Sequence, residues 1–330
     1  MQMRDPHQGL RSHRRTQFYI REAAENDANL VDRLNRLQRD QLRWGNFYGH
    51  MFTEDAEQIL PWGDDPDSGF SVAIEPYNSD VEELITDGLI SPTGPSSTLE
   101  TALRYHLSWV ADMMLRGQAV YEIDLLSDAD GKKVAFRTGW IPQGTIDKRK
   151  GRYIQYVPEE LGDGRKHKGC YYVELNENML IWPRLPRSMR STLRRAASTL
   201  AEASAQQSTP SVMLRARVQE FNLTQFKNKQ AREVLSATRD LGWHARWLFD
   251  EQMTSPYIVW RHLEFQRFKI SIRDAGITNL NRALALAGAE VGFKARLVLD
   301  GAITERDVDR AQNELRAGSR PLTELLSMHA

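Results

Sequence analysis

Acidic residues followed by lysines between positions 121 and 133 form the pattern in the sequence best suited to chemistry. Glu122 and Asp124 would share one face of a β-strand, because side chains repeat every two residues along a strand. Lys132 and Lys133 follow just beyond a turn at 128–131. Metal-dependent nucleases use carboxylates and a lysine on adjacent strands to hold Mg²⁺ and activate water. The alternative is an exposed strand face with Glu/Asp–Lys pairs across a hairpin, and the lysines' position after the turn favours it.

Other catalytic and metal-binding motifs are missing. The eight histidines include no pair spaced as in HExxH, and the single cysteine, Cys170, cannot build a zinc finger. The sequence has no GxxxxGK[ST] loop, no GxGxxG between a strand and a helix, and no GxSxG elbow. His106 lies beside the apolar stripe of a predicted helix, where a structural role is expected. We therefore expect no metal centre, no cofactor and no enzymatic activity.

Two clusters of cationic side chains could contact the phosphate groups of DNA. The first lies on a loop leading into a strand and comprises Lys148, Arg149, Lys150 and Arg152. An exposed hairpin tip explains this cluster equally well. The second lies at the start of a predicted helix and comprises Arg187, Arg190, Arg194 and Arg195. Positive charge at a helix N-terminus opposes the macrodipole, so the second cluster suggests an external partner.

The composition is that of a folded protein without an excess of either charge. Of the 330 residues, 41% are hydrophobic and 27% charged, and 44 Lys and Arg balance 44 Asp and Glu. This balance argues against a protein that binds nucleic acid by being basic throughout, although local basic patches remain compatible with it. No apolar run approaches the roughly 18 residues that span a membrane. The arginine-containing residues 1–16 lack the apolar stretch of a signal peptide and are expected to form a flexible basic arm.

The clearest structural signal spans residues 97–183, which we expect to be a scaffold. Ser97 and Glu100 have the spacing of a capping box, apolar residues then recur every three to four positions, and Gly117 occupies the place of a left-handed cap. Closely spaced strands are predicted at 119–126, 133–140, 152–157, 169–175 and 178–182. Strands joined by such short turns indicate an antiparallel meander.

The rest of the chain is predicted to be mainly helical. A helix or helix pair with a basic side is expected at 18–52, and further helices at 82–89, 188–205, 219–250, 255–273, 277–289 and 304–315. The stretch 257–273 also alternates like a strand at Phe268, Ile270 and Ile272, but its length and start signals favour a helix. The fold class is α+β, with an antiparallel β-module flanked by long helices.

Three regions are predicted. They are an N-terminal helical region with the basic arm (1–96), a helix plus β-module (97–205) and a mainly helical C-terminal region (206–330). The polar stretch 206–211 is the best candidate linker.

A helix ending in a glycine runs directly into the stretch 117–123, which reads Gly-Gln-Ala-Val-Tyr-Glu-Ile. A hairpin closed by Asp130-Gly131, the step 140–142 (Trp-Ile-Pro), a strand with two tyrosines and a strand ending at 179–182 follow. This order, over roughly 97–290, resembles the portal proteins of tailed bacteriophages, in which the first stretch reads G-N-A-Y-x-E-I. Gln118 stands where portals usually have Asn, and Trp182-Pro183 where they commonly have a histidine.

The resemblance implies a non-enzymatic structural protein of the virion, assembled in the bacterial cytoplasm. It would form a homo-oligomeric ring of about twelve subunits at one capsid vertex, with a channel for double-stranded DNA. Its partners would be copies of itself, DNA, and the capsid, terminase and tail or connector proteins, with no membrane. Overall neutrality fits a conduit, because tight phosphate binding would stall translocation. The alternatives are a metal-dependent nuclease and a DNA-binding protein of a phage or mobile element.

Overall fold

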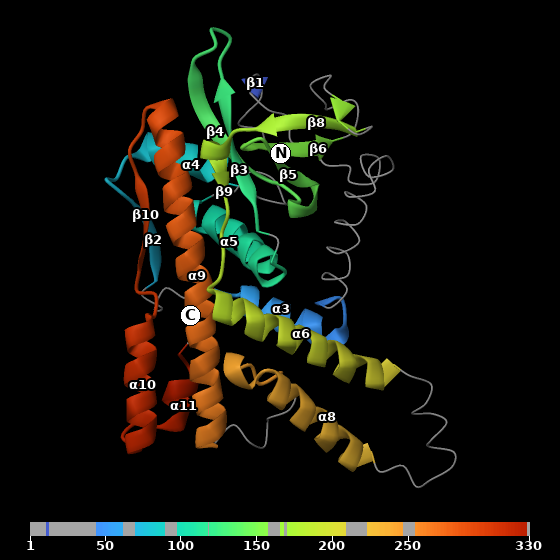
Figure 1. Ribbon diagram of the computed structural model, residues 1–330. Coiled ribbons are helices and arrows are strands. Elements are labelled where there is room, and N and C mark those ends of the chain that lie inside the picture. Colours follow the sequence, from blue (N-terminus) through green and yellow to red (C-terminus); the bar gives the residue numbers. More distant parts are fainter. Residues whose placement is uncertain are drawn as a thin grey trace, which may run out of the picture. The chain divides into compact units, whose positions relative to one another are not determined.

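The computed structural model has a mixed α+β architecture (Figure 1). It describes residues 11–12, 44–61, 70–89, 98–117, 119–157, 166–167, 170–208, 223–246 and 255–328. Eight α-helices and several small antiparallel sheets lie within these residues. In the same parts of the chain, no helix combines the length and the apolar character needed to cross a membrane.

The chain forms two compact units, each assembled from three separate segments. Unit 1 contains residues 1–39, 62–184 and 275–301, and unit 2 contains residues 40–61, 185–274 and 302–330. Both units therefore combine segments from all three regions expected from the sequence, and the predicted domain limits stay a prediction.

Helix α5 (Leu99–Leu115) is the capped amphipathic helix that the sequence predicts in unit 1. Its N-cap differs from the prediction: Thr98, not Ser97, accepts a hydrogen bond from the backbone N–H of Thr101 at 3.2 Å. Ser97 lies outside the described residues, and the Glu100 side chain pairs with Arg104 at 2.9 Å instead of closing a capping box. The C-terminal prediction is confirmed, since Gly117 has a φ of 71° in the left-handed region where glycine is favoured.

The predicted five-strand meander is instead divided between two sheets. One sheet joins β3 (Tyr121–Ser127) to β4 (Lys133–Trp140), with β1 (Arg11–Ser12) and β9 (Leu180–Ile181) also pairing with β3. The other has the order β5 (Ile146–Arg149), β6 (Arg152–Val157), β8 (Cys170–Leu175) and β7 (Lys166–His167). A buried apolar cluster of Val120, Ile141, Ile146, Leu175 and Leu180 draws its members from both sheets. Burial of shared apolar side chains, rather than a continuous strand ladder, therefore connects the sheets.

A second pair of strands in unit 1 joins distant parts of the chain. β2 (Ser71–Glu75) pairs antiparallel with β10 (Arg296–Asp300), and Arg296 donates to Glu75 at 2.6 Å. Helix α4 (Ser79–Gly88) contacts α5 and β4. The short helix expected at 82–89 is thus confirmed, with an earlier start at the N-cap Asn78.

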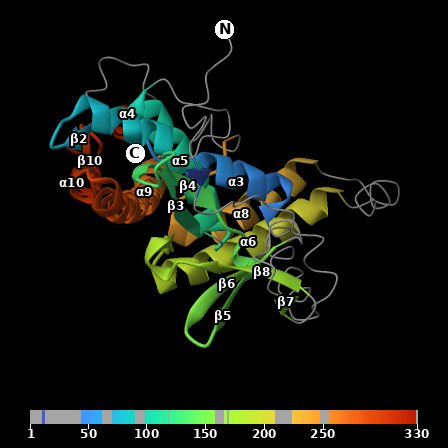
Figure 2. The same cartoon turned by 90° about the horizontal axis from the view of Figure 1, so that it is seen from above.

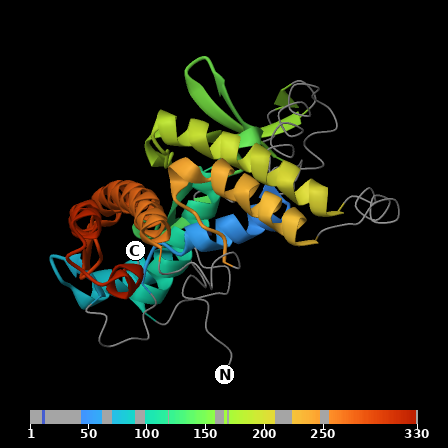
Figure 3. The ribbon, with the colours of Figure 1, turned by 90° about the horizontal axis from the view of Figure 1, so that it is seen from below.

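Helices α3 (Phe47–Glu57), α6 (Arg187–Ser208) and α8 (Leu223–Ala237) pack together in unit 2, and Figure 3 shows α6 and α8 side by side. The Ser204 hydroxyl accepts from the Tyr48 N–H at 3.2 Å and donates to Asn46 at 2.8 Å, which ties α6 to the start of α3. The helix expected at 188–205 is confirmed. Of the helix expected at 18–52, residues 18–43 lie outside the described part.

The long helix expected at 219–250 is wrong for residues 238–246, while 219–222 and 247–250 lie outside the described residues. After Ala237 the chain turns through a 3₁₀ segment, η5 (Arg239–Leu241), and Gly242 adopts a φ of 74°. The turn is tightly packed, because a Cβ on Gly242 would come within 2.4 Å of the Arg261 carbonyl oxygen. Gly242 therefore ends a turn instead of kinking a continuous helix.

Helix α9 (Pro256–Val291) runs without a break, whereas two helices at 255–273 and 277–289 were expected. Its residues up to 274 belong to unit 2, and those from 275 onwards to unit 1. Gly276 does not interrupt the helix but permits close packing, since a Cβ there would lie 2.9 Å from Leu107 of α5. The expected start at Ser255-Pro256 and the helical state of 257–273 are confirmed.

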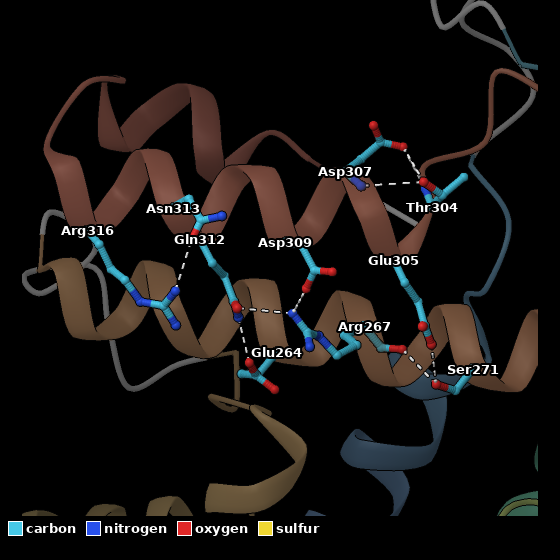
Figure 4. A network of polar contacts seen from close by, with 10 residues as sticks. All are labelled: Glu264, Arg267, Ser271, Thr304, Glu305, Asp307, Asp309, Gln312, Asn313 and Arg316. Atoms are coloured by element: carbon cyan, nitrogen blue, oxygen red, sulfur yellow. Dashed lines mark hydrogen bonds and ion pairs between the residues drawn. The ribbon is translucent and has the colours of Figure 1, made fainter.

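The C-terminal helices α10 (Glu305–Ala317) and α11 (Leu322–Leu326) pack on α9 through an apolar cluster that includes Val259, Leu263, Val308 and Leu325. The helix expected at 304–315 is confirmed, and a capping box begins it, as Thr304 and Asp307 exchange hydrogen bonds at the start of α10. A polar seam then runs along α9 and α10 (Figure 4). In it, Arg267 donates to Asp309 at 2.6 Å.

Candidate nucleic-acid interface

The first predicted cationic cluster lies on a regular β-hairpin in unit 1 (Figure 2). Arg149 of β5 stands opposite Arg152 of β6, so only Lys150 and Gly151 form the turn. Both turn residues have positive φ, 48° and 83°, as a two-residue type I′ turn requires. Asn and Gly are preferred at such positions, and Lys150 therefore holds a backbone conformation that is unfavourable for its side chain. Of the two readings left open by the sequence, a loop leading into a strand and an exposed hairpin tip, the structure shows the hairpin tip.

Carboxylates offset most of the charge of this hairpin. Lys148 lies 3.4 Å from Glu177, Arg149 lies 2.7 Å from Asp147, and Arg152 lies 3.3 Å from Glu174. The Lys148 ammonium also lies 4.6 Å from the centre of the Tyr153 ring. All three cations remain partly exposed, so they can still meet a phosphate group, but the neighbouring carboxylates weaken that attraction. Lys150 lies exposed at the tip, and it is the member of the cluster that forms no ion pair within the described residues.

The second cluster lies on α6 in unit 2. Arg187, Arg190 and Arg194 are spaced by three and four residues, which places them in one row along the helix, and all three are exposed. None of them makes an ion pair within the described parts of the chain. Arg195 differs, because it lies off this row and 3.4 Å from Asp240. The three arginines thus present concentrated positive charge at the N-terminal half of a helix, where the macrodipole disfavours it.

Glu122 and Asp124 of β3 are buried, each only 2% exposed. The expectation of an exposed strand face is therefore wrong. Asp124 accepts two hydrogen bonds from Arg137, at 3.0 and 2.8 Å, and Arg137 stands directly opposite it on β4. A cross-strand pair does form, but its cation is an arginine inside the hairpin instead of a lysine after the turn.

The lysines beyond the turn do not join these carboxylates. Lys133 stands opposite Ser127, three residues further along β3 than Asp124, and its ammonium pairs with Glu290 of α9. Lys132 is exposed. Within the residues that the structure describes, no three His, Cys, Asp or Glu side chains gather in a group that could hold a metal ion. The nuclease pattern expected from spacing therefore does not assemble at this hairpin.

His106 is fully buried on α5, and the edge of its ring meets the Tyr121 ring, with 5.3 Å between the ring centres. Neither ring nitrogen has a hydrogen-bond partner among the described residues, nor does the Tyr121 hydroxyl. Burial lowers the pKa of His106 to about 3, which keeps the ring neutral at physiological pH. The structural role expected from the sequence is consistent with these surroundings.

Three buried cations on α9 have no counterpart in the sequence-based expectations. Arg261, Lys269 and Arg273 are at most 6% exposed, and each donates to backbone carbonyl groups of another segment. Arg261 donates to the carbonyl of Leu235 in the last turn of α8 and to those of Thr238 and Trp243 in the turn that follows it. Lys269 donates to the carbonyl of Gln58, after α3, at 3.1 Å. The carbonyl ends of helices carry partial negative charge, so these cations stabilise the packing of α3 and α8 on α9.

In the sequence, the one signal for these buried cations is their spacing of eight and four residues along α9. They are structural and add nothing to a nucleic-acid surface. The hairpin cations and the α6 row are both exposed, and they belong to different units. No protein-family model, no curated protein and no solved structure matches this chain.

Proposed function

We propose that this protein is a portal-like ring subunit that forms a channel for double-stranded DNA at a phage capsid vertex. The observation that carries the proposal is the junction between α5 and β3. Helix α5 ends in left-handed Gly117, and the chain then enters β3 through Ala119 and Val120, both buried. This junction holds the stretch that resembles portal proteins, apart from Gln118, which lies outside the described residues.

The length of α9 supports a structural role. At a rise of about 1.5 Å per residue, its 36 residues give a rod of about 54 Å. Residues on this one helix belong to both units, and its buried cations bind the carbonyl ends of its neighbours. A rod of this kind suits a protein that must transmit force between a capsid and a packaging motor.

The charges of the β5–β6 hairpin suit a surface past which DNA moves. A cation with a carboxylate close by attracts phosphate weakly, because the fields of the two charges partly cancel at distances larger than their separation. Salt screens what remains over a Debye length of about 8 Å. Lys148, Arg149 and Arg152 are such cations, and with Lys150 at the tip they form the group that we assign to DNA. The remaining partners would be neighbouring copies and the capsid, terminase and tail or connector proteins, and no cofactor is required.

Mass photometry and negative-stain microscopy of the full chain test the ring. Rings of about twelve subunits are expected at micromolar concentration. A monomer that persists under these conditions, in low and in moderate salt, would contradict the proposal.

DNA binding is tested separately by replacing Lys148, Lys150 and Arg152 with glutamine. The affinity for duplex DNA should fall, and the slope of log K against log salt should decrease by about one for each cation that no longer meets a phosphate. The matched control replaces Lys132, Arg282 and Lys294, three exposed cations of the same unit, with glutamine. An equal decrease in affinity for both triple variants would show that the hairpin has no special role.

A further inference from the structure

A pocket of about 250 Å³ lies in unit 2 between α6, η5, α9 and α10. Three carboxylates, Asp240, Glu264 and Glu305, face one guanidinium group, that of Arg267, and Met189 and Phe268 contribute apolar surface. Such a lining suits a long cationic side chain, because the aliphatic part can lie on the apolar surface while the charged head meets the carboxylates.

Two of the carboxylates in this pocket accept hydrogen bonds from neutral groups. Glu264 accepts from the neutral amide of Gln312 at 2.5 Å, and Glu305 accepts from the Ser271 hydroxyl at 3.4 Å (Figure 4). Arg267 is directed to Asp309 at 2.6 Å, outside the pocket lining. Of the three carboxylates, Asp240 alone forms an ion pair within the described residues, with the exposed Arg195.

The α6 arginine row lies on the opposite side of the helix that borders this pocket. At about 100° per residue, Met189 and Thr192 point roughly 130° and 170° away from the mean direction of the row formed by Arg187, Arg190 and Arg194. One helix of unit 2 thus carries a cationic surface on one side and part of an anionic pocket on the other. A head-to-tail contact between identical subunits requires two different, complementary surfaces of this kind.

We infer that the row formed by Arg187, Arg190 and Arg194 in one copy docks into the Asp240–Glu264–Glu305 pocket of the next copy. Arginine suits this contact, since its planar guanidinium can donate two parallel hydrogen bonds to a carboxylate. A row without neighbouring carboxylates would also hold phosphate more tightly than a DNA conduit tolerates, which favours a protein partner for it. The inference rests on the proposed ring, and it names the surfaces that build it.

A disulfide cross-link between copies tests the contact directly. In a Cys170→Ser background, Arg190→Cys and Thr192→Cys are introduced together. Side chains two positions apart on a helix do not face each other, so a disulfide between these positions must join two chains. Mild oxidation should produce a ladder of covalent oligomers on a non-reducing gel. The single variant Arg190→Cys should give no ladder, and efficient 190–190 dimers from it would overturn the inference, because they would show a two-fold symmetric contact.

Charge reversal provides the second test. Arg190→Glu with Arg194→Glu should raise the concentration at half assembly by roughly tenfold for each reversed arginine. Adding Asp240→Lys and Glu305→Lys to the same chain should recover much of the assembly, because both surfaces are then reversed. The control Arg232→Glu with Arg306→Glu reverses two exposed arginines of the same unit and should leave assembly unchanged.

The outcomes separate this inference from the proposed function. The inference would be overturned if the native chain forms rings, the Arg190→Glu/Arg194→Glu variant assembles equally well, and the cysteine pair gives no ladder. The proposed ring would survive that result. The Arg190→Glu/Arg194→Glu variant could also form intact rings but bind DNA more weakly and with less salt dependence. That result would assign the row to DNA and would overturn the inference. A native chain that stays monomeric would refute both proposals.

Discussion

Replacement of His106 by leucine is expected to stabilise the protein, although it removes a fully buried residue of similar size. A neutral imidazole has one N–H donor and one acceptor nitrogen, and neither finds a partner in the described residues around α5. A buried polar atom left unsatisfied costs about 1–3 kcal/mol. Removal of the ring interaction with Tyr121 offsets about 1 kcal/mol of the gain. For the two ring nitrogens together, the expected net change in the free energy of unfolding at pH 7 is a gain of about 1–5 kcal/mol.

The same substitution should change the response to acid. The pKa of His106 is about 3 in the folded chain, against 6.5 in an unfolded one. Between these values the unfolded chain binds a proton that the folded chain does not, so the native protein loses stability as the pH falls below 6.5. Linkage makes this loss about 2 kcal/mol between pH 7 and pH 5. The advantage of His106→Leu should therefore grow by about 2 kcal/mol over that interval.

Urea unfolding followed by tryptophan fluorescence at pH 7 and pH 5 measures both effects. His50→Leu is the matched control, because His50 is an exposed histidine on α3 and its replacement should leave stability within about 0.5 kcal/mol at either pH. Subtracting the free energy of unfolding of the native chain from that of the variant at each pH cancels the contributions of the other histidines. A His106→Leu variant less stable than the native chain at pH 7, or an advantage that does not change with pH, would refute the argument.

Three further substitutions test separate parts of the structure. Lys150→Asn should raise thermal stability by about 0.5–1 kcal/mol, because Asn tolerates the positive φ of the hairpin turn, and a lower melting temperature would contradict the turn geometry. Arg261→Met should lower the free energy of unfolding in urea by about 3 kcal/mol, because buried carbonyls lose their donor; an unchanged value would mean that desolvation of the guanidinium offsets its hydrogen bonds. Thr304→Ala should destabilise the start of α10 by about 1 kcal/mol, seen as faster amide exchange there and not in α5. Hydrogen bonds from Thr304 lower the pKa of Asp307, so this contribution is present above the ordinary pKa of aspartate and is lost as the pH falls through the lowered value.

Local signals explain which elements were predictable. The capping box at Thr304 and Asp307 and the left-handed Gly117 depend on residues within a few positions of each other, and both are present. The pairing of β2 with β10 joins Glu75 to Arg296 across 221 residues, and no local pattern reports such a partner. Division of the strands into two sheets was missed for the same reason, since spacing along the chain does not determine which strands pair.

The predicted carboxylate site shows how spacing alone misleads. The period of a strand correctly placed Glu122 and Asp124 on one face, but it could not show that this face is buried. Nor could it show that Arg137, in the partner strand, stands opposite Asp124, because that depends on the register set by the hairpin turn. The cationic clusters were easier to place, since their charges are adjacent in the sequence. Their ion pairs with Glu174, Glu177 and Asp240 involve residues 22 to 45 positions away.

Helix α9 explains why the pattern of polar and apolar residues did not distinguish a helix from a strand in the C-terminal half. Phe268, Ile270 and Ile272 alternate with polar residues, which resembles a strand with one buried face. In the structure Lys269 and Arg273 are buried as well, because the helix is covered on several sides and these cations reach carbonyl groups at Gln58 and Ile303. Burial lowers the pKa of Lys269 to about 8, because the charged ammonium is disfavoured away from water. A long helix that is covered on several sides can thus keep buried cations where neighbouring segments end against it. In such a helix, a polar residue can indicate a contact with a buried carbonyl group as well as a position that faces solvent.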